Sequence, residues 1–315
     1  MKLSLVIPIY NEESLLKELK DRLDRVFNSQ TDDYEIIFVD DGSYDSSPEI
    51  LQEFVEKDPH SIVIKLSRNF GHQLSITAGI SQADGDALVI MDGDLEDPPE
   101  IIPEFVRKWK EGYKVVLGRR RSRQTHVIKK VLFNAFYKIF SFLSDYPIPL
   151  HCGVFCLLDK QVYHHLLNLT ERNRFIPGLR VWLGFKTASV LYDRQQRYAG
   201  APKQTLSKLF KYALDAIFSF SYKPLRISLF AGIIIFLVSS FYACILIVMR
   251  LLQINVVSGF TTIAVSLFFF GGALLVSNGI LGEYLGRIYD EVKKRPLYII
   301  DEVLRNESEN SSHVS

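Results

Sequence analysis

The chain has 315 residues, and its 37 Lys and Arg residues nearly balance its 36 Asp and Glu residues, which gives a formal net charge of +1. A hydrophobic content of 48%, with 12% aromatic residues, supplies a large core, so disordered and collagen-like classes are excluded, as is a generally basic nucleic-acid binder. The mean hydropathy of +0.09 is high for a chain with 23% charged residues, and it indicates a soluble part joined to a concentrated apolar part.

Residues 1 to about 120 predict strands that alternate with helices. Short apolar runs bounded by polar turns predict strands, and apolar residues at a spacing of three and four predict amphipathic helices. The predicted strands are Lys2–Pro8, Tyr34–Asp40, Ser61–Leu66, Ala87–Asp92 and Lys114–Gly118. The predicted helices are Glu12–Phe27, Ser46–Lys57, Gln73–Ala83 and Pro99–Glu111. This alternation is typical of an α/β, doubly wound domain with a mostly parallel sheet.

Two long uncharged runs near the C-terminus predict transmembrane helices. Ile227–Met249 lies between Arg226 and Arg250, and Phe260–Leu281 ends shortly before Glu283. Each run exceeds the roughly 18 residues that indicate a membrane span. The alternative, a pair of buried core helices, is disfavoured because core helices of this length usually carry a polar stripe.

Basic residues flank the outer ends of these two runs, whereas the link between them carries only Arg250. The positive-inside rule therefore places both termini in the cytoplasm. No signal peptide is expected, because the first apolar run is short and Pro8 breaks it. The predicted organisation is a cytoplasmic α/β domain over 1–225, a transmembrane hairpin over 226–285 and a cytoplasmic tail over 286–315, in a multi-pass protein of the cell (inner) membrane.

Acidic residues cluster where the predicted strands end. The first strand ends in PIYNEE, the second in VDDGSYDSS and the fourth in MDGDLEDPPE. Ligands of open α/β sheets bind outside the carboxyl ends of the strands. Three acidic ends at one crevice would repel each other unless a cation or the hydroxyls of a sugar engage them. Neither G-x-G-x-x-G after a strand nor G-x-x-x-x-G-K-[ST] is present, which disfavours dinucleotide and P-loop sites.

Asp92 and Asp94 are candidate metal ligands. They lie two residues apart at a predicted strand end, so the period of two places both carboxylates on one face. Hard oxygen ligands in this arrangement suit Mg²⁺ or Mn²⁺ shared with a substrate diphosphate. Such a metal would neutralise charge on a departing nucleoside diphosphate. A bare acidic turn is the alternative interpretation of D-x-D taken alone.

These segments resemble the family 2 glycosyltransferases with the GT-A (Rossmann-like) fold. The resemblance is to the polyprenyl-phosphate glycosyltransferase group, which includes dolichyl-phosphate mannose synthase and bacterial undecaprenyl-phosphate glucosyltransferases. It covers nearly the whole chain and is carried by VIPIYNEE, VDDGSYDSS, LSRNFGHQLSITAGISQADGD, MDGDLEDPPE, RNRFIPGLRVWLGF, ALDAIFSFSYKPLR and GEYLGRIYDEVKKRPLY. The resemblance implies an inverting, metal-dependent transfer of a single sugar from a UDP- or GDP-sugar to undecaprenyl or dolichyl phosphate at the cytoplasmic membrane face.

The resemblance also implies roles for individual residues. The residues that would line the nucleoside pocket are Pro8, Tyr10, Glu12, Asp40 and Asp41. Asp92 and Asp94 would be the catalytic pair that binds the diphosphate through Mg²⁺ or Mn²⁺. Guanidinium groups bind phosphate well. The acceptor phosphate would meet the basic run of Arg119, Arg120, Arg121 and Arg123 after the fifth strand, with Arg119, Arg121 and Arg123 as the candidate ligands. A solvated charge run is the alternative for each of these arginines.

One segment departs from the family's pattern. Where many members have Gly-Asp-Phe-Arg, with the aspartate taken as the catalytic base, this chain has Val154 and Cys156 at the aspartate and arginine positions. A phosphate monoester has a second pKa of about 6, so the acceptor is largely deprotonated at pH 7 and needs positioning more than a base. We therefore still expect an active transferase. Asp159 and His72 are expected to be structural, with a catalytic His72 as the minor alternative.

Two amphipathic stretches, Lys129–Ser144 and Thr205–Phe220, are typical of interfacial helices that contact a lipid bilayer, with core packing as the alternative. Gly282 and Gly286 form a small-xxx-small pair that favours close helix contact, and we expect a homo-oligomer. Two other functions stay open. A processive polysaccharide synthase is disfavoured because RQQRYAG lacks the tryptophan of Q-x-x-R-W. A membrane scaffold that has lost its chemistry has Val154 as its main support.

Overall fold

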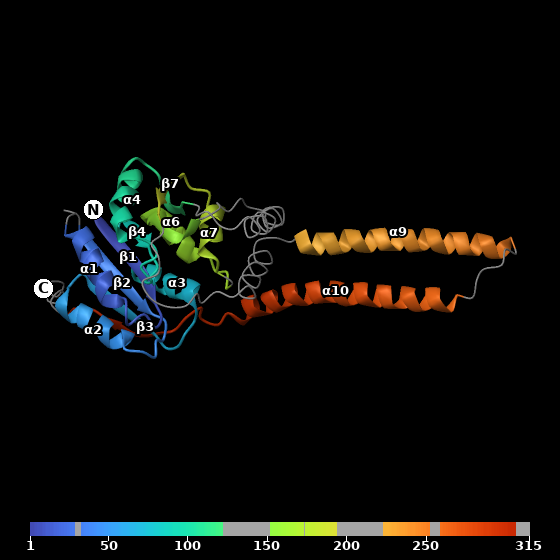
Figure 1. Cartoon of the computed structure of the whole chain (residues 1–315), viewed down its shortest axis with the longest axis horizontal. Coiled ribbons are helices and arrows are strands. Elements are labelled where there is room, and N and C mark those ends of the chain that lie inside the picture. The colour runs from blue at the N-terminus through green and yellow to red at the C-terminus, as the bar shows by residue number, and fades with distance from the viewer. Residues whose placement is uncertain (29–32, 122–151, 173, 194–222, 253–258, 307–315) are drawn as a thin grey trace. The chain divides into compact units, whose positions relative to one another are not determined.

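The structure is a computed structural model that describes residues 1–28, 33–121, 152–172, 174–193, 223–252 and 259–306. The chain divides into two compact units. The first comprises Met1–Val131, Tyr146–Thr205 and Arg295–Ser315, and the second comprises Leu132–Asp145 and Leu206–Lys294. The first unit is a layered α/β domain, and the described part of the second is a pair of long helices (Figure 1).

Within the described residues, an eight-stranded sheet of order β7-β5-β6-β4-β1-β2-β3-β8 forms the centre of the first unit. The strands are β1 (Lys2–Ile9), β2 (Asp33–Asp40), β3 (Ser61–Leu66), β4 (Ala87–Ile90), β5 (Val115–Arg120), β6 (Cys152–Asp159), β7 (Thr187–Tyr192) and β8 (Ile300–Leu304). The strands β3, β2, β1 and β4 are parallel. Because β6 is antiparallel to both β4 and β5, strands β5 and β7 run in the same direction as β4. Strand β8 pairs antiparallel with β3.

Helices cover both faces of this sheet. On one face lie α1 (Leu16–Phe27), α2 (Ser47–Lys57), the short η1 (Pro99–Ile101) and α4 (Ile102–Lys110). On the other face lie α3 (His72–Gln82), α6 (Lys160–Asn168) and α7 (Ile176–Trp182). The predicted doubly wound α/β arrangement is therefore confirmed.

A single apolar core lies between the sheet and the face covered by α1, α2 and α4. Leu5, Ile7, Phe38, Phe105 and Phe155 are fully buried in it. Burial of each such side chain contributes about 1.5–3 kcal/mol relative to leaving it exposed. This core holds in place the strands whose carboxyl ends carry the polar residues described below.

The predicted strands and helices of residues 1–120 agree with the structure to within a few residues, except at two ends. The predicted helix Glu12–Phe27 starts later, at Leu16. Strand β4 ends at Ile90, and Asp92 lies in the loop that follows. Leu95, farther along the same loop, has a left-handed φ of 56°. The argument that a common strand face carries Asp92 and Asp94 is therefore wrong.

The second unit contains α9 (Lys223–Leu251) and α10 (Phe260–Lys293), which run side by side in opposite directions (Figure 1). Ser228 Oγ of α9 donates to Ser277 Oγ of α10 at 3.0 Å. Both predicted apolar runs lie within these helices. Among the described residues, however, no helix combines the length and apolarity expected of a membrane span. The predicted transmembrane helices are thus not confirmed, and the two amphipathic stretches lie outside the described residues.

Candidate functional site

The loops that follow β1 and β2 are joined by hydrogen bonds. Asn11 N donates to Ser43 Oγ at 3.0 Å, and Tyr44 N donates to Asn11 Oδ1 at 3.0 Å. Glu12 N donates to Ser47 Oγ at 3.1 Å. Asn11 has a left-handed φ of 54°, a conformation that asparagine tolerates better than most residues. Two of the three acidic strand ends are therefore held next to each other.

Asp40 and Asp41 are both buried, and the carboxylate of each accepts hydrogen bonds from backbone N–H groups. Asp40 Oδ1 accepts from Ser43 N at 3.0 Å. The two carboxylate oxygens of Asp41 accept from Phe70 N at 2.7 Å and from Gly71 N at 3.0 Å. Burial raises the pKa of Asp41, and these backbone donors oppose the rise. Asp41 therefore shapes the loop that leads into α3.

Gly42 allows that loop to approach the end of β2 closely. Its φ is +69°, in the left-handed region, and a Cβ at this position would lie 2.7 Å from the carbonyl carbon of Arg68 and 2.8 Å from Asn69 N. Real Cβ atoms are essentially never found so close to backbone. The glycine in VDDGS is thus required by both conformation and space.

Two tyrosines lie at the surface beside these loops. Tyr10 is 39% exposed and Tyr44 is 83% exposed, and their ring centroids are 6.0 Å apart in an edge-to-face arrangement. Of the residues predicted to line a nucleoside pocket, Tyr10 and Glu12 are accessible, whereas Pro8 is buried within β1. Exposed aromatic rings can stack on a planar base. Sequence reasoning missed Tyr44, although it stands in the motif VDDGSYDSS.

Asp92 and Asp94 lie together in the loop after β4, and both are partly exposed. His72 Nε2 lies 2.8 Å from Asp92 Oδ1, and Asp94 Oδ1 accepts from Glu96 N at 3.2 Å. Partial burial lowers the pKa of His72, but the carboxylates of Asp92, Asp41 and Asp94 raise it above its usual value. The residue expected to be structural thus directly contacts a predicted catalytic aspartate.

The orientation of His72 is fixed by its neighbour. Gln73 Oε1 accepts from Ile176 N at 2.9 Å, which leaves the Gln73 amide nitrogen to donate to His72 Nδ1 at 3.3 Å. In the neutral imidazole, the proton therefore lies on Nε2 and is directed at Asp92. Through this chain of contacts the first turn of α7 is connected to the D-x-D loop.

The donor set of this loop fits a divalent cation that is shared with a substrate. Mg²⁺ is usually held by one or two carboxylates together with substrate phosphates and water. Asp92 and Asp94 supply two such carboxylates. Within the part of the chain that the structure describes, no group of three or more His, Cys, Asp and Glu residues forms a metal site from protein ligands alone.

A buried network anchors the far end of the D-x-D loop. Arg120 Nη2 lies 3.2 and 3.4 Å from the two oxygens of Asp97, Arg120 Nε donates to the Tyr192 hydroxyl at 3.0 Å, and that hydroxyl donates to Asp97. Burial raises the pKa of Asp97 to about 6, although Arg120 and Tyr192 oppose the rise. The network ties the loop to β5 and β7. Sequence reasoning missed Asp97, which nevertheless lies in MDGDLEDPPE.

The predicted acceptor arginines differ in their surroundings. Arg119 lies on β5 opposite Cys152 and is exposed. Arg121 pairs with Asp193 at 3.2 Å, and both side chains are largely exposed. A surface pair of this kind contributes at most about 1 kcal/mol, so a phosphate can compete for the arginine. Arg123 lies outside the described residues. Val154 is 7% exposed and offers no titratable group.

The comparisons with known proteins identify the family. Residues 4–167 match the family described as Glycosyl transferase family 2. The chain belongs to this family. It is 43% identical over 298 residues to the "Uncharacterized glycosyltransferase YkcC" of Bacillus subtilis (strain 168), with 94% of this chain and 92% of the relative covered. It is 38% identical over 301 residues to the SfII prophage-derived bactoprenol glucosyl transferase of Shigella flexneri, with coverages of 95% and 97%.

A solved structure is similar over a smaller part of the chain. The crystal structure of glucosyl-3-phosphoglycerate synthase from Mycobacterium tuberculosis, in complex with Mn²⁺, UDP and phosphoglyceric acid, has a TM-score of 0.47 and 17% identity. The match covers 69% of this chain and 76% of that one. The family match and the near full-length relatives confirm that the protein is a glycosyltransferase with a GT-A-like mixed α/β domain. The resemblance to the polyprenyl-phosphate group is confirmed as well.

Proposed function

We propose that this glycosyltransferase transfers a single sugar, with inversion, from a UDP- or GDP-sugar to a polyprenyl phosphate at the cytoplasmic face of a membrane. The observation that carries the proposal is the similarity to relatives named bactoprenol glucosyl transferases, which extends over 95% of the chain. The acid-rich edge formed by the ends of β1, β2 and β4 provides the donor site.

The donor diphosphate binds at Asp92 and Asp94. A bound Mg²⁺ or Mn²⁺ supplies neutralisation of the negative charge that builds on the leaving nucleoside diphosphate. His72 orients Asp92, and the Asp97 network holds the loop that carries both carboxylates. Tyr10 offers an exposed ring for the base, and Tyr44 lies against it.

The acceptor phosphate attacks the anomeric carbon of the sugar directly. Because a phosphate monoester is largely dianionic at pH 7, its oxygen needs no base at the position of Val154. It needs positive charge and a fixed approach, which lower the barrier through electrostatic stabilisation and proximity. Arg119 and Arg121, at the carboxyl end of β5, provide part of that charge.

The hairpin of α9 and α10 contacts lipid in this proposal, with the catalytic domain in the cytoplasm. Its supporting observation is the number of large apolar side chains that the hairpin exposes, including Phe230 at 61%, Leu237 at 59%, Leu267 at 70% and Leu275 at 73%. Extraction of membranes with alkaline carbonate tests it, since release of the full chain into the supernatant would contradict lipid insertion. Whether both helices cross the bilayer, and whether the chain forms a homo-oligomer, stay predictions from the sequence.

The reaction is tested with membranes that contain the full chain. They are incubated with labelled UDP-glucose, UDP-N-acetylglucosamine or GDP-mannose and with undecaprenyl or dolichyl phosphate, and the lipid-linked product is extracted. We expect one donor to give an organic-soluble product, which chelation by EDTA abolishes and Mg²⁺ or Mn²⁺ restores. The absence of product from every donor, with folded protein present, would refute the proposal. A polymeric product would indicate a processive synthase instead.

A matched pair of variants localises the chemistry. Asp94→Asn removes a carboxylate from the D-x-D loop and should lower turnover by about two orders of magnitude or more, the size of loss seen when a transition-state electrostatic contact is removed. Asp84→Asn alters a 78% exposed carboxylate that pairs with Lys160 at the opposite end of β4 and should leave turnover unchanged. Equal turnover by the two variants would show that Asp94 has no part in the chemistry, whereas a scaffold would give no turnover in the wild type or in either variant.

A further inference from the structure

Arg180 on α7 is a buried cation for which the described residues supply no anionic partner. It is 3% exposed, and Nη2 donates to the carbonyl oxygen of Gly153 at 2.9 Å. Its Nε and Nη1 have no hydrogen-bond partner in the described part of the chain. An uncompensated buried charge costs several kcal/mol. Such a residue is expected only where something supplies the missing negative charge.

A second buried arginine shows the contrast. Arg174 is 6% exposed, and it donates from Nη1 to Leu169 O and from Nη2 to Leu166 O, each at 2.6 Å. It therefore caps the carbonyl end of α6, a common structural role for arginine. Arg180 has one carbonyl partner and the Cys156 thiol beside it, and it caps no helix end, so structural capping does not account for it.

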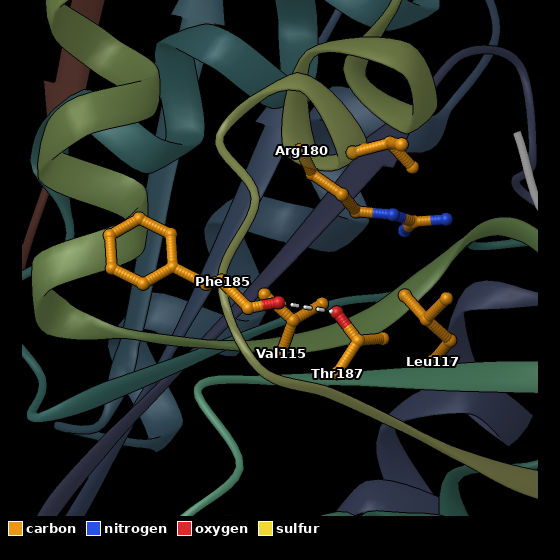
Figure 2. A pocket seen from close by; sticks show the side chains of 6 residues that line it. Val115, Leu117, Arg180, Phe185 and Thr187 are labelled. Atoms are coloured by element: carbon orange, nitrogen blue, oxygen red, sulfur yellow. Dashed lines mark hydrogen bonds between the residues drawn. The ribbon is translucent and has the colours of Figure 1, made fainter. Parts of the chain in front are cut away.

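The side chain of Arg180 borders a pocket between α7 and strands β5 and β7. Figure 2 shows it reaching across this pocket, above Leu117 of β5. The pocket has a volume of about 130 Å³, and its other lining residues are Val115, Val181, Phe185 and Thr187. One water needs about 10–15 Å³, so the pocket has room for a group of several heavy atoms. The Thr187 hydroxyl donates to Phe185 O at 2.9 Å. Among the described residues that line the pocket, Arg180 is the only cation.

Val115 and Thr187 of the pocket begin β5 and β7 and lie level with the start of β4, so only the end of the pocket formed by Arg180 adjoins the segment that departs from the family's pattern. Gly153, which accepts from Arg180, lies at the start of β6, and β6 is antiparallel to β4, so this end of β6 lies at the edge of the sheet where β4 ends. Burial raises the pKa of the Cys156 thiol, which the adjacent Arg180 guanidinium opposes, and the neutral thiol supplies no anion. Cys156 occupies the arginine position of Gly-Asp-Phe-Arg. Arg180, from α7, therefore places a guanidinium group beside the position of β6 at which the Gly-Asp-Phe-Arg pattern has its arginine.

We propose that Arg180 binds the phosphate group of the acceptor at the end of this pocket beside Gly153. The phosphate would neutralise the buried cation and accept charge-assisted hydrogen bonds from Nε and Nη1, which are stronger than bonds between neutral groups. The inference rests on the proposed function, because that function supplies a phosphate monoester as substrate. It adds a binding residue from a different element to the exposed arginines of β5.

Kinetics of the full chain test the inference. Arg180→Met keeps the length and apolar stem of the side chain, and we expect it to raise the KM for polyprenyl phosphate by about tenfold or more while the KM for the nucleotide sugar changes by less than about twofold. Thermal stability should be retained or increased, because an unpaired buried charge has been removed. Arg174→Met should do the reverse, lowering thermal stability without a selective effect on the acceptor KM. An Arg180→Met enzyme whose acceptor KM matches that of the wild type would overturn the inference and leave the proposed function intact.

Binding without turnover provides an independent readout. The thermal midpoint of the full chain in detergent is measured with farnesyl phosphate or inorganic phosphate against sodium chloride at equal ionic strength. A rise in the thermal midpoint that Arg180→Met and Arg180→Gln both abolish supports the inference. If only farnesyl phosphate raises the midpoint, the site recognises a lipid headgroup; if inorganic phosphate raises it as well, the site recognises the phosphate itself. Equal shifts in the wild type and both variants, or no shift with either probe, would refute it. Because no sugar is transferred, this result stands even if the proposed reaction fails.

Discussion

The pKa of Asp97 gives the sharpest prediction for the buried network. Burial raises it from 3.8 to about 6 in the folded protein, a shift of about 2 units, which corresponds to about 3 kcal/mol. Because the folded state binds this proton more tightly than the unfolded state, the stability that it contributes is fully present below pH 3.8. That stability is lost as the pH rises through about 6.

The variant Asp97→Asn removes this titration. The difference in unfolding free energy, wild type minus Asp97→Asn, should therefore fall by about 2 kcal/mol between pH 4.5 and 7, which is most of the total effect. The absolute stability of the variant also depends on Arg120, which loses its carboxylate partner, so the slope with pH is the better measure. Urea unfolding of the full chain in detergent, followed by fluorescence at several pH values, provides it.

Two further variants make the reasoning refutable. Tyr192→Phe removes a hydroxyl that donates to Asp97 and lowers its pKa, so the loss of stability should move to higher pH. Asp159→Asn has the opposite sign, because Lys114, Trp109 and the backbone of Gln161 together outweigh burial and lower the pKa of Asp159. Its contribution is present above pH 3.8 and is lost on acidification. Parallel pH profiles for wild type and Asp97→Asn would show that Asp97 does not titrate in this range.

Other substitutions test the local geometry by the same unfolding assay. Gly42→Ala should cost about 2–3 kcal/mol or more, because its φ of +69° is unfavourable for alanine and backbone lies 2.7 Å from the new Cβ. Gly112→Ala, with a φ of +92° and nothing within 4 Å, should cost only the conformational part, about 1–2 kcal/mol, and an equal loss in both variants would contradict the steric argument. Ser4→Ala should cost about 1–3 kcal/mol, since Ser4 donates to Glu35 at 2.5 Å and accepts from Gly85 N at 2.8 Å in a buried position; a neutral effect would mean that water replaces the hydroxyl.

Much of the α/β domain could be predicted from the sequence, because its elements follow local rules. Each of the parallel strands β1 to β3 is a short apolar run buried on both faces, and Ser61–Leu66 was predicted with its observed limits. The strands that were not predicted depend on tertiary pairing. Strand β7 alternates between exposed and half-buried residues at an edge beside β5, and β8 pairs with β3 from a distance of more than 230 residues along the chain. No local pattern in Ile300–Leu304 indicates that partner.

The acidic residues of the site could be predicted for the same reason. Parallel topology brings the ends of β1, β2 and β4 to one edge, so motifs that follow those strands meet there. What each residue does at that edge could not be predicted, because it depends on side-chain geometry. Asp41 resembles Asp40 in sequence, yet both of its oxygens hold the loop before α3. His72 contacts Asp92 while its neighbour Gln73 contacts the other ring nitrogen and accepts from the first residue of α7.

The arginines near the candidate site differ in how deeply their side chains are buried, and we expect their roles to differ accordingly. Arg120 pairs with Asp97 and so holds the D-x-D loop, which is the donor side in the proposed reaction. Arg121 pairs with an exposed carboxylate and can exchange it for a substrate phosphate. In the proposed reaction Arg180 contributes the charge that water screens least, because effective dielectric falls with burial. In the proposed reaction, the buried charge of Arg180 also explains why Val154, rather than an aspartate, is suitable at that position. A carboxylate at that position would lie on the same face of β6 as Cys156, beside Arg180, and would compete with the acceptor phosphate for its charge. An already anionic nucleophile gains more from an unpaired buried guanidinium than from a base.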